Sequence, residues 1–263
     1  MITAQKQMQA LIVTWRKPDD SAYIAIGRLI YSPGPDRPEY EFAFLHGVHY
    51  AIKRGLGELL AFPDINRVYG SNVLFPFFQN RVMQPSRPDY PEFVRNLALE
   101  PGHATPMDIL IRTGGGRVTD SFELFEYPVH NEPLQPYRTH FLAHGLRYLA
   151  KSSLERIATL EPGGQLCVMQ DCQNAYDGRA LALRTDDRVI VGYVPGFLLA
   201  EALQLWKQCQ YIHCSVTKAN STTAPLQQRL LCRLETCWPE DHQPFADEEF
   251  QPISPDATNL FTR

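Results

Sequence analysis

Apolar and polar residues alternate in short runs along most of this chain, a pattern that predicts β-strands joined by turns. The strand-like runs lie at residues 11–14, 23–31, 40–45, 121–127, 139–148, 165–169, 180–183, 188–193, 210–217 and 226–234. Apolar residues at helical spacing predict helices at residues 48–60, where Gly55 and Gly57 interrupt the pattern, and at residues 90–99, 107–110, 154–160 and 197–206. We therefore expect a mainly β protein with some α-helix.

Composition divides the chain into two folded regions and a tail. Its 263 residues, 44% of them hydrophobic, leave room for two small domains with real cores. Prolines with few apolar neighbours at 132–136 predict a linker, so we expect domains at residues 1–132 and 137–238. Residues 239–263 are rich in proline and acidic residues, which predicts a flexible acidic tail.

A polar turn at residues 173–178 is the most distinctive stretch of the chain. It carries one aromatic ring, Tyr176, between Asn174 and Asp177, and it lies between two strand-like runs. Polar loop residues held by strands favour a binding site. The same residues are also ordinary turn chemistry, since Asn174 and Asp177 can cap backbone amides while Tyr176 covers the end of the sheet.

Three motifs, taken in order, give this region a resemblance to a known family. They are Gly-Leu-Arg-Tyr at 145–148, Asn-Ala-Tyr-Asp followed by Arg-Ala-Leu at 174–181, and Val-Gly-Tyr-Val-Pro at 191–195. Residues 137–238 resemble a HIRAN domain. The resemblance implies an OB-like β-barrel that binds the 3′ end of single-stranded DNA and has no enzymatic activity.

The resemblance also implies which side chains contact the DNA. They are Arg147, Tyr148, Asn174, Tyr176, Asp177, Arg179 and Tyr193. Tyr148 and Tyr176 match the rings that stack on the terminal base, and each stacked base stabilises binding by roughly 1–3 kcal/mol. A carboxylate accepts the proton of a free 3′ hydroxyl but repels a phosphate, so Asp177 is expected to select a free end.

The other side chains of this set have alternative roles. Asn174 offers a donor and an acceptor to the base edge, Arg147 offers a partner for phosphate, and Arg179 is a second source of phosphate contacts. No lysine follows Tyr193 where the best-known family members have a basic residue, so weak affinity is expected. Arg147 could instead pair with Asp177, and Tyr148 could lie in the core.

The first domain resembles a different family. The run Leu-Phe-Pro-Phe-Phe-Gln-Asn-Arg at 74–81, an Asp-Ile-Leu helix at 108–110 and a glycine turn at 114–116 follow the order of the N-terminal subdomain of HipA-type kinases. The resemblance covers about residues 10–130 and implies a small α+β domain that docks a protein partner. Because no phosphate loop, catalytic Asp/Asn pair or metal-binding Asp motif follows, no kinase activity is expected.

Charge limits the kind of nucleic-acid contact that we expect. The net charge of −4 is unlike that of a protein that coats nucleic acid. Residues 135–240 carry 11 basic against 9 acidic residues, whereas the rest of the chain is net acidic. A DNA site should therefore be compact and depend on stacking and hydrogen bonds.

Six cysteines fall in three pairs, each separated by four residues, at 167/172, 209/214 and 232/237. The two-residue gap common in zinc sites is absent, so we expect neither a metal nor another cofactor. No apolar run approaches the roughly 20 residues needed to cross a bilayer. With no signal peptide recognised, we expect a cytoplasmic protein without a membrane partner and without disulfides.

Two functions follow from these observations. The first is a non-enzymatic binder of single-stranded DNA 3′ ends, with a protein partner docked through residues 1–132, in DNA repair or phage defence. The alternative is a regulatory or antitoxin-like subunit of a HipA-type kinase system, in which the barrel is a structural platform that binds no DNA end.

Overall fold

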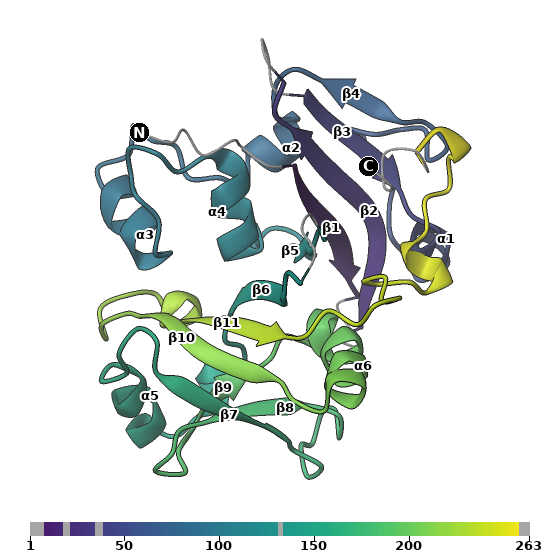
Figure 1. Ribbon diagram of the computed structural model, residues 1–263. Coiled ribbons are helices and arrows are strands. Elements are labelled where there is room, and N and C mark those ends of the chain that lie inside the picture. The colour runs from purple at the N-terminus through teal and green to yellow at the C-terminus, as the bar shows by residue number, and fades with distance from the viewer. Residues whose placement is uncertain (1–7, 18–21, 35–38, 131–133, 258–263) are drawn as a thin grey trace. The chain divides into compact units, whose positions relative to one another are not determined.

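The computed structural model describes residues 8–17, 22–34, 39–130 and 134–257, and these form two compact units (Figure 1). Unit 1 contains Met1–Met83, Gly114–Val129 and Pro244–Arg263, and unit 2 contains Gln84–Thr113 and His130–Gln243. The chain therefore passes between the units more than once. The limits of these units differ from those of the domains expected at 1–132 and 137–238. The functions expected for those two domains stay predictions. The expected linker lies partly outside the described residues.

Unit 1 is built on a five-stranded antiparallel sheet with the order β4-β3-β2-β1-β5. Its strands are β1 Gln9–Arg16, β2 Tyr23–Ser32, β3 Glu39–Phe44, β4 Tyr69–Ser71 and β5 Phe122–Tyr127. Both β1 and β2 are buried along almost their whole length, so the sheet is covered on both faces. Two short helices belong to this unit, α1 Gly47–Lys53 and α2 Pro76–Gln79.

The run at 74–81 has a structural role in unit 1. Phe78 is fully buried, and the side chain of Arg81 is 1% exposed. The Arg81 guanidinium donates to the Gly115 carbonyl at 3.0 Å and to both carboxylate oxygens of Asp120 at 3.0 and 2.8 Å. This bidentate contact ties the end of α2 to the glycine turn before β5 and pairs the buried guanidinium with a carboxylate.

Unit 2 contains a six-stranded antiparallel sheet with the order β6-β11-β10-β7-β8-β9. Its strands are β6 Tyr137–Leu142, β7 Gln165–Gln170, β8 Leu181–Arg184, β9 Ile190–Tyr193, β10 His213–Ala219 and β11 Leu230–Thr236. Beyond the end of β6, His144 pairs with Tyr193 of β9 through two backbone hydrogen bonds of 2.9 and 3.0 Å. This pair joins the two edges of the sheet, which curls into a small barrel. The mainly β architecture with some helix is confirmed, and the curled sheet fits the expected OB-like barrel.

Helices and short 3-10 turns complete unit 2. They are α3 Tyr90–Asn96, α4 Pro106–Thr113, α5 Lys151–Ile157, α6 Leu199–Cys209, η1 Leu146–Tyr148, η2 Gly196–Leu198 and η3 Leu226–Gln228. Buried Asn220, in the turn between β10 and β11, donates to the Asn96 carbonyl at 2.8 Å and so attaches α3 to the barrel. Within the described part of the chain, no helix has the length and hydropathy needed to span a bilayer.

Much of the expected tail packs into unit 1. Phe245 is 5% exposed, and its ring lies 5.0 Å from that of Phe125. Pro252 pairs with Leu45, and a 3-10 turn, η4 Glu248–Phe250, lies between these two contacts along the chain. The expectation of a flexible tail is wrong for residues 244–257, because their few apolar side chains are used for burial; residues 258–263 lie outside the described part.

One pair of cysteines forms a disulfide, which corrects the expectation of none. Cys209 at the end of α6 and Cys237 just after β11 are joined, with their Cα atoms 5.8 Å apart. The two bonded cysteines are 28 residues apart in the chain. They do not belong to the same one of the three closely spaced pairs seen in the sequence. Cys214 and Cys232 are buried thiols in adjacent strands, and burial raises the pKa of Cys232.

Candidate functional site

The barrel closes where His144 pairs with Tyr193, and we call this place the seam. The segment after β6, the end of β9 and the loop between β7 and β8 meet there. Gly145 follows the His144–Tyr193 pair and has a φ of 76°, and a Cβ atom at this position would lie 2.8 Å from Cδ2 of Tyr193. Glycine allows the chain to turn here over the Tyr193 ring. The turn ends the strand that the sequence predicted to run through Tyr148, so this tyrosine lies on η1.

Tyr148 and Tyr176 form an exposed pair of rings beside this seam. Their side chains are 61% and 82% exposed, and their ring centroids lie 5.8 Å apart at an interplanar angle of 34°. The guanidinium of Arg147 lies 4.7 Å from the centroid of the Tyr148 ring, within cation–π distance. The alternative in which Tyr148 lies in the core is wrong. Two large rings left in solvent by a folded loop are available to a ligand.

Asn174 holds the loop between β7 and β8 in shape. Its Oδ1 accepts hydrogen bonds from the backbone N–H of Tyr176 at 3.0 Å and from that of Asp177 at 3.2 Å. Its Nδ2 donates to Asp171 at 3.5 Å. Because the carbonyl oxygen of the amide already accepts two bonds, the turn-forming role is confirmed for Asn174, and little of its amide is left for a base edge.

Asp171 is a residue of the site that the motifs did not single out. Its Oδ2 accepts a hydrogen bond from the hydroxyl of Tyr193 at 3.1 Å, and its backbone N–H donates to the Ala180 carbonyl at 2.8 Å. Burial, together with the hydrogen bond and charge of Asp171, raises the pKa of Tyr193. Asp171 thus ties the loop to the seam. Its position at the start of the polar turn, directly after β7, was the only signal for it in the sequence.

Asp177 is paired with Arg179 within the same loop. Its Oδ1 accepts from the Arg179 backbone N–H at 2.8 Å and from Arg179 Nε at 3.3 Å. Partial burial acts to raise the pKa of Asp177, but the bonds and charge of Arg179 outweigh it and lower that pKa. The pairing of Asp177 with Arg147 considered above is therefore wrong. The carboxylate is ionised at neutral pH, with its charge partly balanced by an exposed arginine.

The structure brings the predicted side chains together in two layers. Arg147, Tyr148 and Tyr176 form the exposed layer, and Asp177 and Arg179 follow Tyr176 on the same loop. Tyr193 is half-buried under Gly145 and supports the seam. Among the described residues, no group of three or more His, Cys, Asp or Glu side chains could hold a metal ion.

The region that contains these side chains is similar to known proteins. Residues 137–235 match the family model described as HIRAN domain. A search of the curated proteins gives no significant match. Among solved structures, a protein from Lactobacillus plantarum is 22% identical over 38% of this chain and 90% of its own, with a TM-score of 0.31. The HIRAN domain of human HLTF is 18% identical over 39% of this chain and 73% of its own, with a TM-score of 0.27.

Proposed function

We propose that unit 2 binds the 3′ end of single-stranded DNA, without performing chemistry on it. The observation that carries the proposal is the exposed ring pair Tyr148–Tyr176 at the barrel seam. The HIRAN match over residues 137–235 supports DNA as the ligand. Stacking of bases on exposed aromatic rings needs little basic surface, which agrees with the net charge of −4.

The ring pair holds the terminal base by stacking. For a base to stack between two rings, the two ring planes must lie about two stacking distances apart, each of about 3.4 Å. The centroids of Tyr148 and Tyr176 are 5.8 Å apart, so a small rotation of these exposed side chains admits the base. Arg147 then offers its guanidinium, already on the face of Tyr148, to the phosphate behind the terminal sugar.

Asp177 selects for a free end, and Arg179 moderates the selection. An ionised carboxylate accepts the proton of a 3′ hydroxyl and repels a 3′ phosphate. At an exposed site two unit charges about 4 Å apart interact by about 1 kcal/mol in water. The Arg179 charge opposes part of this repulsion, so a discrimination of about fivefold or less is expected from an interaction of this size.

The test compares the affinity for an oligonucleotide that ends in a 3′ hydroxyl with that for its 3′-phosphate twin, by fluorescence anisotropy. The wild-type protein should prefer the hydroxyl. Asp177→Asn keeps the acceptor for the Arg179 backbone N–H and loses the charge, so the preference should vanish. Arg179→Gln should increase it.

The matched control is Asp187→Asn. Asp187 is also paired with an arginine in unit 2, Arg156, at 3.0 Å, and its pKa is likewise lowered, to about 2. This variant should keep the preference of the wild type. Equal affinity of the wild type for the two oligonucleotides would remove the role of Asp177.

For residues 1–132 we propose docking of a protein partner, in DNA repair or phage defence. Three large apolar side chains of unit 1 support it, Leu60, Val73 and Val118, which are 88%, 69% and 106% exposed. Leu60→Glu with Val73→Glu should release the partner in a pull-down from host cells and leave DNA affinity unchanged. If the protein captures a partner in the pull-down but does not bind DNA ends, the regulatory or antitoxin-like alternative is favoured.

A further inference from the structure

The outward face of β6, β11 and β10 carries side chains that the end-binding site does not use. Residue pairing places Arg138 beside Glu235 and His140 beside Arg233. One row further along, Lys218 of β10 lies beside Leu231. Tyr137, Thr139 and Phe141 alternate with Arg138 and His140 and are buried, so Arg138 and His140 share the opposite face of β6. α4 packs against β6, and Leu231 on this face is fully buried, so the exposed part of the face is the part around Arg138 and Arg233.

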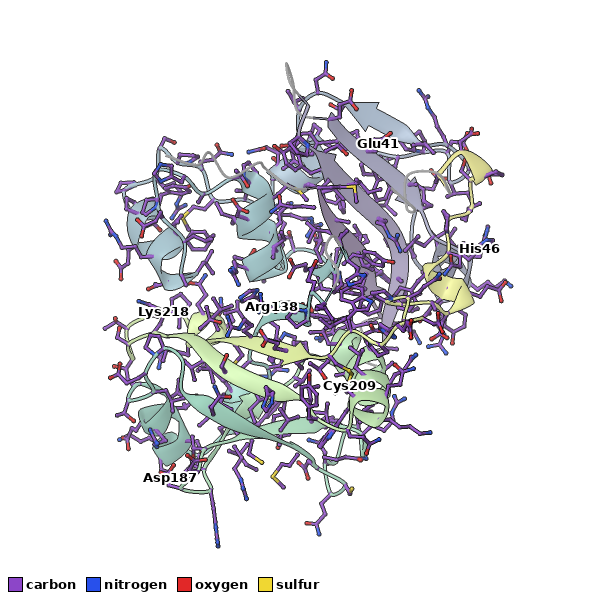
Figure 2. All side chains as sticks on the ribbon, in the orientation of Figure 1. Glu41, His46, Arg138, Asp187, Cys209 and Lys218 are labelled. Carbon is purple, nitrogen blue, oxygen red and sulfur yellow. A yellow bond between two sulfur atoms is a disulfide. The ribbon has the colours of Figure 1, made fainter. Side chains whose placement is uncertain are left out.

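This face has an excess of positive charge. Arg138 and Arg233 both approach Glu235, at 2.5 and 4.0 Å, and their side chains are still 50% and 44% exposed. Glu235 is one carboxylate between two arginines, so the group retains a net positive charge that faces solvent. We call Arg138, Arg233 and Lys218 the basic face; Figure 2 labels Arg138 and Lys218.

His140 lies beside these arginines and is largely buried. Burial, and then the charges of Arg112 on α4, Arg233 and Arg138, lower its pKa to about 3. The imidazole is therefore neutral at pH 7 and adds no charge of its own. A neutral histidine among arginines is compatible with a bound anion, because it offers a hydrogen bond and no repulsion.

We infer that the basic face binds phosphodiester groups of the same DNA strand, several nucleotides inside the 3′ end. The inference rests on the proposed function for the location of that end. Arg138 and Tyr148 are ten residues apart in the chain, which at about 3.3 Å per residue is a reach of at most about 33 Å. OB folds bind about 4–16 nucleotides, so one short strand can reach both places. Arg138, Arg233 and Lys218 lie on three different strands. Such a spread of positive charge can contact several phosphates of one strand, whereas one small anion could contact only part of it.

The experiment measures the affinity of the whole protein for a trinucleotide and for a strand of about 12 nucleotides, each over a range of salt concentration. Arg138→Gln with Arg233→Gln should leave trinucleotide binding unchanged. For the longer strand, affinity should fall, and the slope of log K against log salt should be less steep by about 1.4, about 0.7 for each lost phosphate contact.

Two further variants keep the result interpretable. Glu235→Gln releases both arginines and should strengthen binding of the longer strand, an effect that damage to the fold would not produce. Arg156→Gln, which removes an exposed arginine paired with Asp187, should change neither affinity nor slope.

The outcomes separate this inference from the proposed function. Wild-type affinity and slope in the double variant would overturn the inference, and so would equal losses for both oligonucleotides. Stabilisation of the protein by inorganic phosphate, with no change in slope, would assign the face to a free anion and overturn it too. A trinucleotide that fails to bind the wild type contradicts the end site alone; an arginine-dependent slope for the longer strand would still support the basic face.

Discussion

Tyr148 and Tyr176 are the side chains on which the proposed binding depends most. Replacing either by alanine should weaken binding of a single-stranded oligonucleotide by roughly 1–3 kcal/mol, the value of one stacked base. Replacement by phenylalanine keeps the ring and should keep most of the affinity, because stacking needs the π face and not the hydroxyl. Fluorescence anisotropy titrations measure both.

Tyr50 provides the matched control for these variants. It is a 47% exposed tyrosine of unit 1 with an arginine, Arg54, 4.4 Å from its ring centroid, which resembles the Arg147–Tyr148 contact. Tyr50→Ala should leave the affinity unchanged. Wild-type affinity in both Tyr148→Ala and Tyr176→Ala would contradict the stacking role.

His140 predicts a dependence of stability on pH. Its pKa in the folded protein is about 3, below the ordinary value of 6.5, chiefly because of burial and then the charges of Arg112, Arg233 and Arg138. Below pH 6.5 the unfolded chain therefore binds a proton that the folded chain does not. The contribution of His140 to the free energy of unfolding should fall as pH drops from about 6.5 to about 3.

His140→Gln removes this proton uptake, and thermal melts at about pH 7 and about pH 4.5 measure the effect. The wild type should lose more stability between the two pH values than the variant does. Equal losses would show that His140 is not held neutral by its surroundings.

The family resemblance singled out Tyr148 and Tyr176, and the structure leaves both rings exposed. The sequence motifs did not decide the role of Asn174. The same side-chain amide can either hold the turn or recognise a base edge, and the motif fits both roles. Asp171 could not be found this way, because its partner Tyr193 lies 22 residues further along the chain and reaches it only through the closure of the barrel. Local chemistry was predictable, and contacts across the seam were not.

At the scale of elements, the turn at Gly145 decides where η1 lies. Gly145→Ala should destabilise the protein in urea unfolding and weaken DNA binding. An added Cβ atom would meet the Tyr193 ring at 2.8 Å, at a φ of 76° that L residues rarely adopt. Gly163→Ala is the control, because Gly163 has a similar φ of 84° and open space around it.

The control variant should show the conformational strain alone, about 1–2 kcal/mol, with DNA affinity unchanged. A loss in Gly145→Ala no larger than in Gly163→Ala would contradict the close packing of the turn on Tyr193.

The disulfide predicts a second effect at this scale. Cys209→Ala with Cys237→Ala should lower the free energy of unfolding of the oxidised protein by about 3–4 kcal/mol, the chain-entropy value for a loop of 28 residues. Cys167→Ser, at an exposed free cysteine, should have little effect. A reducing agent should lower the melting temperature of the wild type towards that of the double variant; equal melting temperatures before and after reduction would contradict the crosslink.

Strands were predictable because their apolar runs are local, and most observed strands lie within a few residues of the expected ones. The exceptions have physical causes. β6 ends at Leu142, whereas the apolar run continues to Tyr148, because Gly145 turns the chain over Tyr193. α1 ends at Lys53, whereas helical spacing continues to residue 60, because Gly55 adopts a φ of 102°.

At the scale of the molecule, the chain crosses between the two units, and composition gave no sign of it. Residues 84–113 join the barrel through contacts such as that of Asn220 with Asn96, and residues 244–257 return to unit 1 through Phe245. Cuts at the expected domain limits would remove parts of both units. The likeness of residues 10–130 to HipA N-terminal subdomains stays a prediction, best tested by substitutions in the whole chain.

Recognition of a strand end at the Tyr148–Tyr176 pair is tested most directly by comparing one sequence in two forms. The affinity of the whole protein is measured for a linear single strand with a free 3′ end and for the same strand closed into a circle. We predict tighter binding of the linear form, with the difference lost in Tyr176→Ala. Equal affinity of the wild type for the two forms would contradict end recognition.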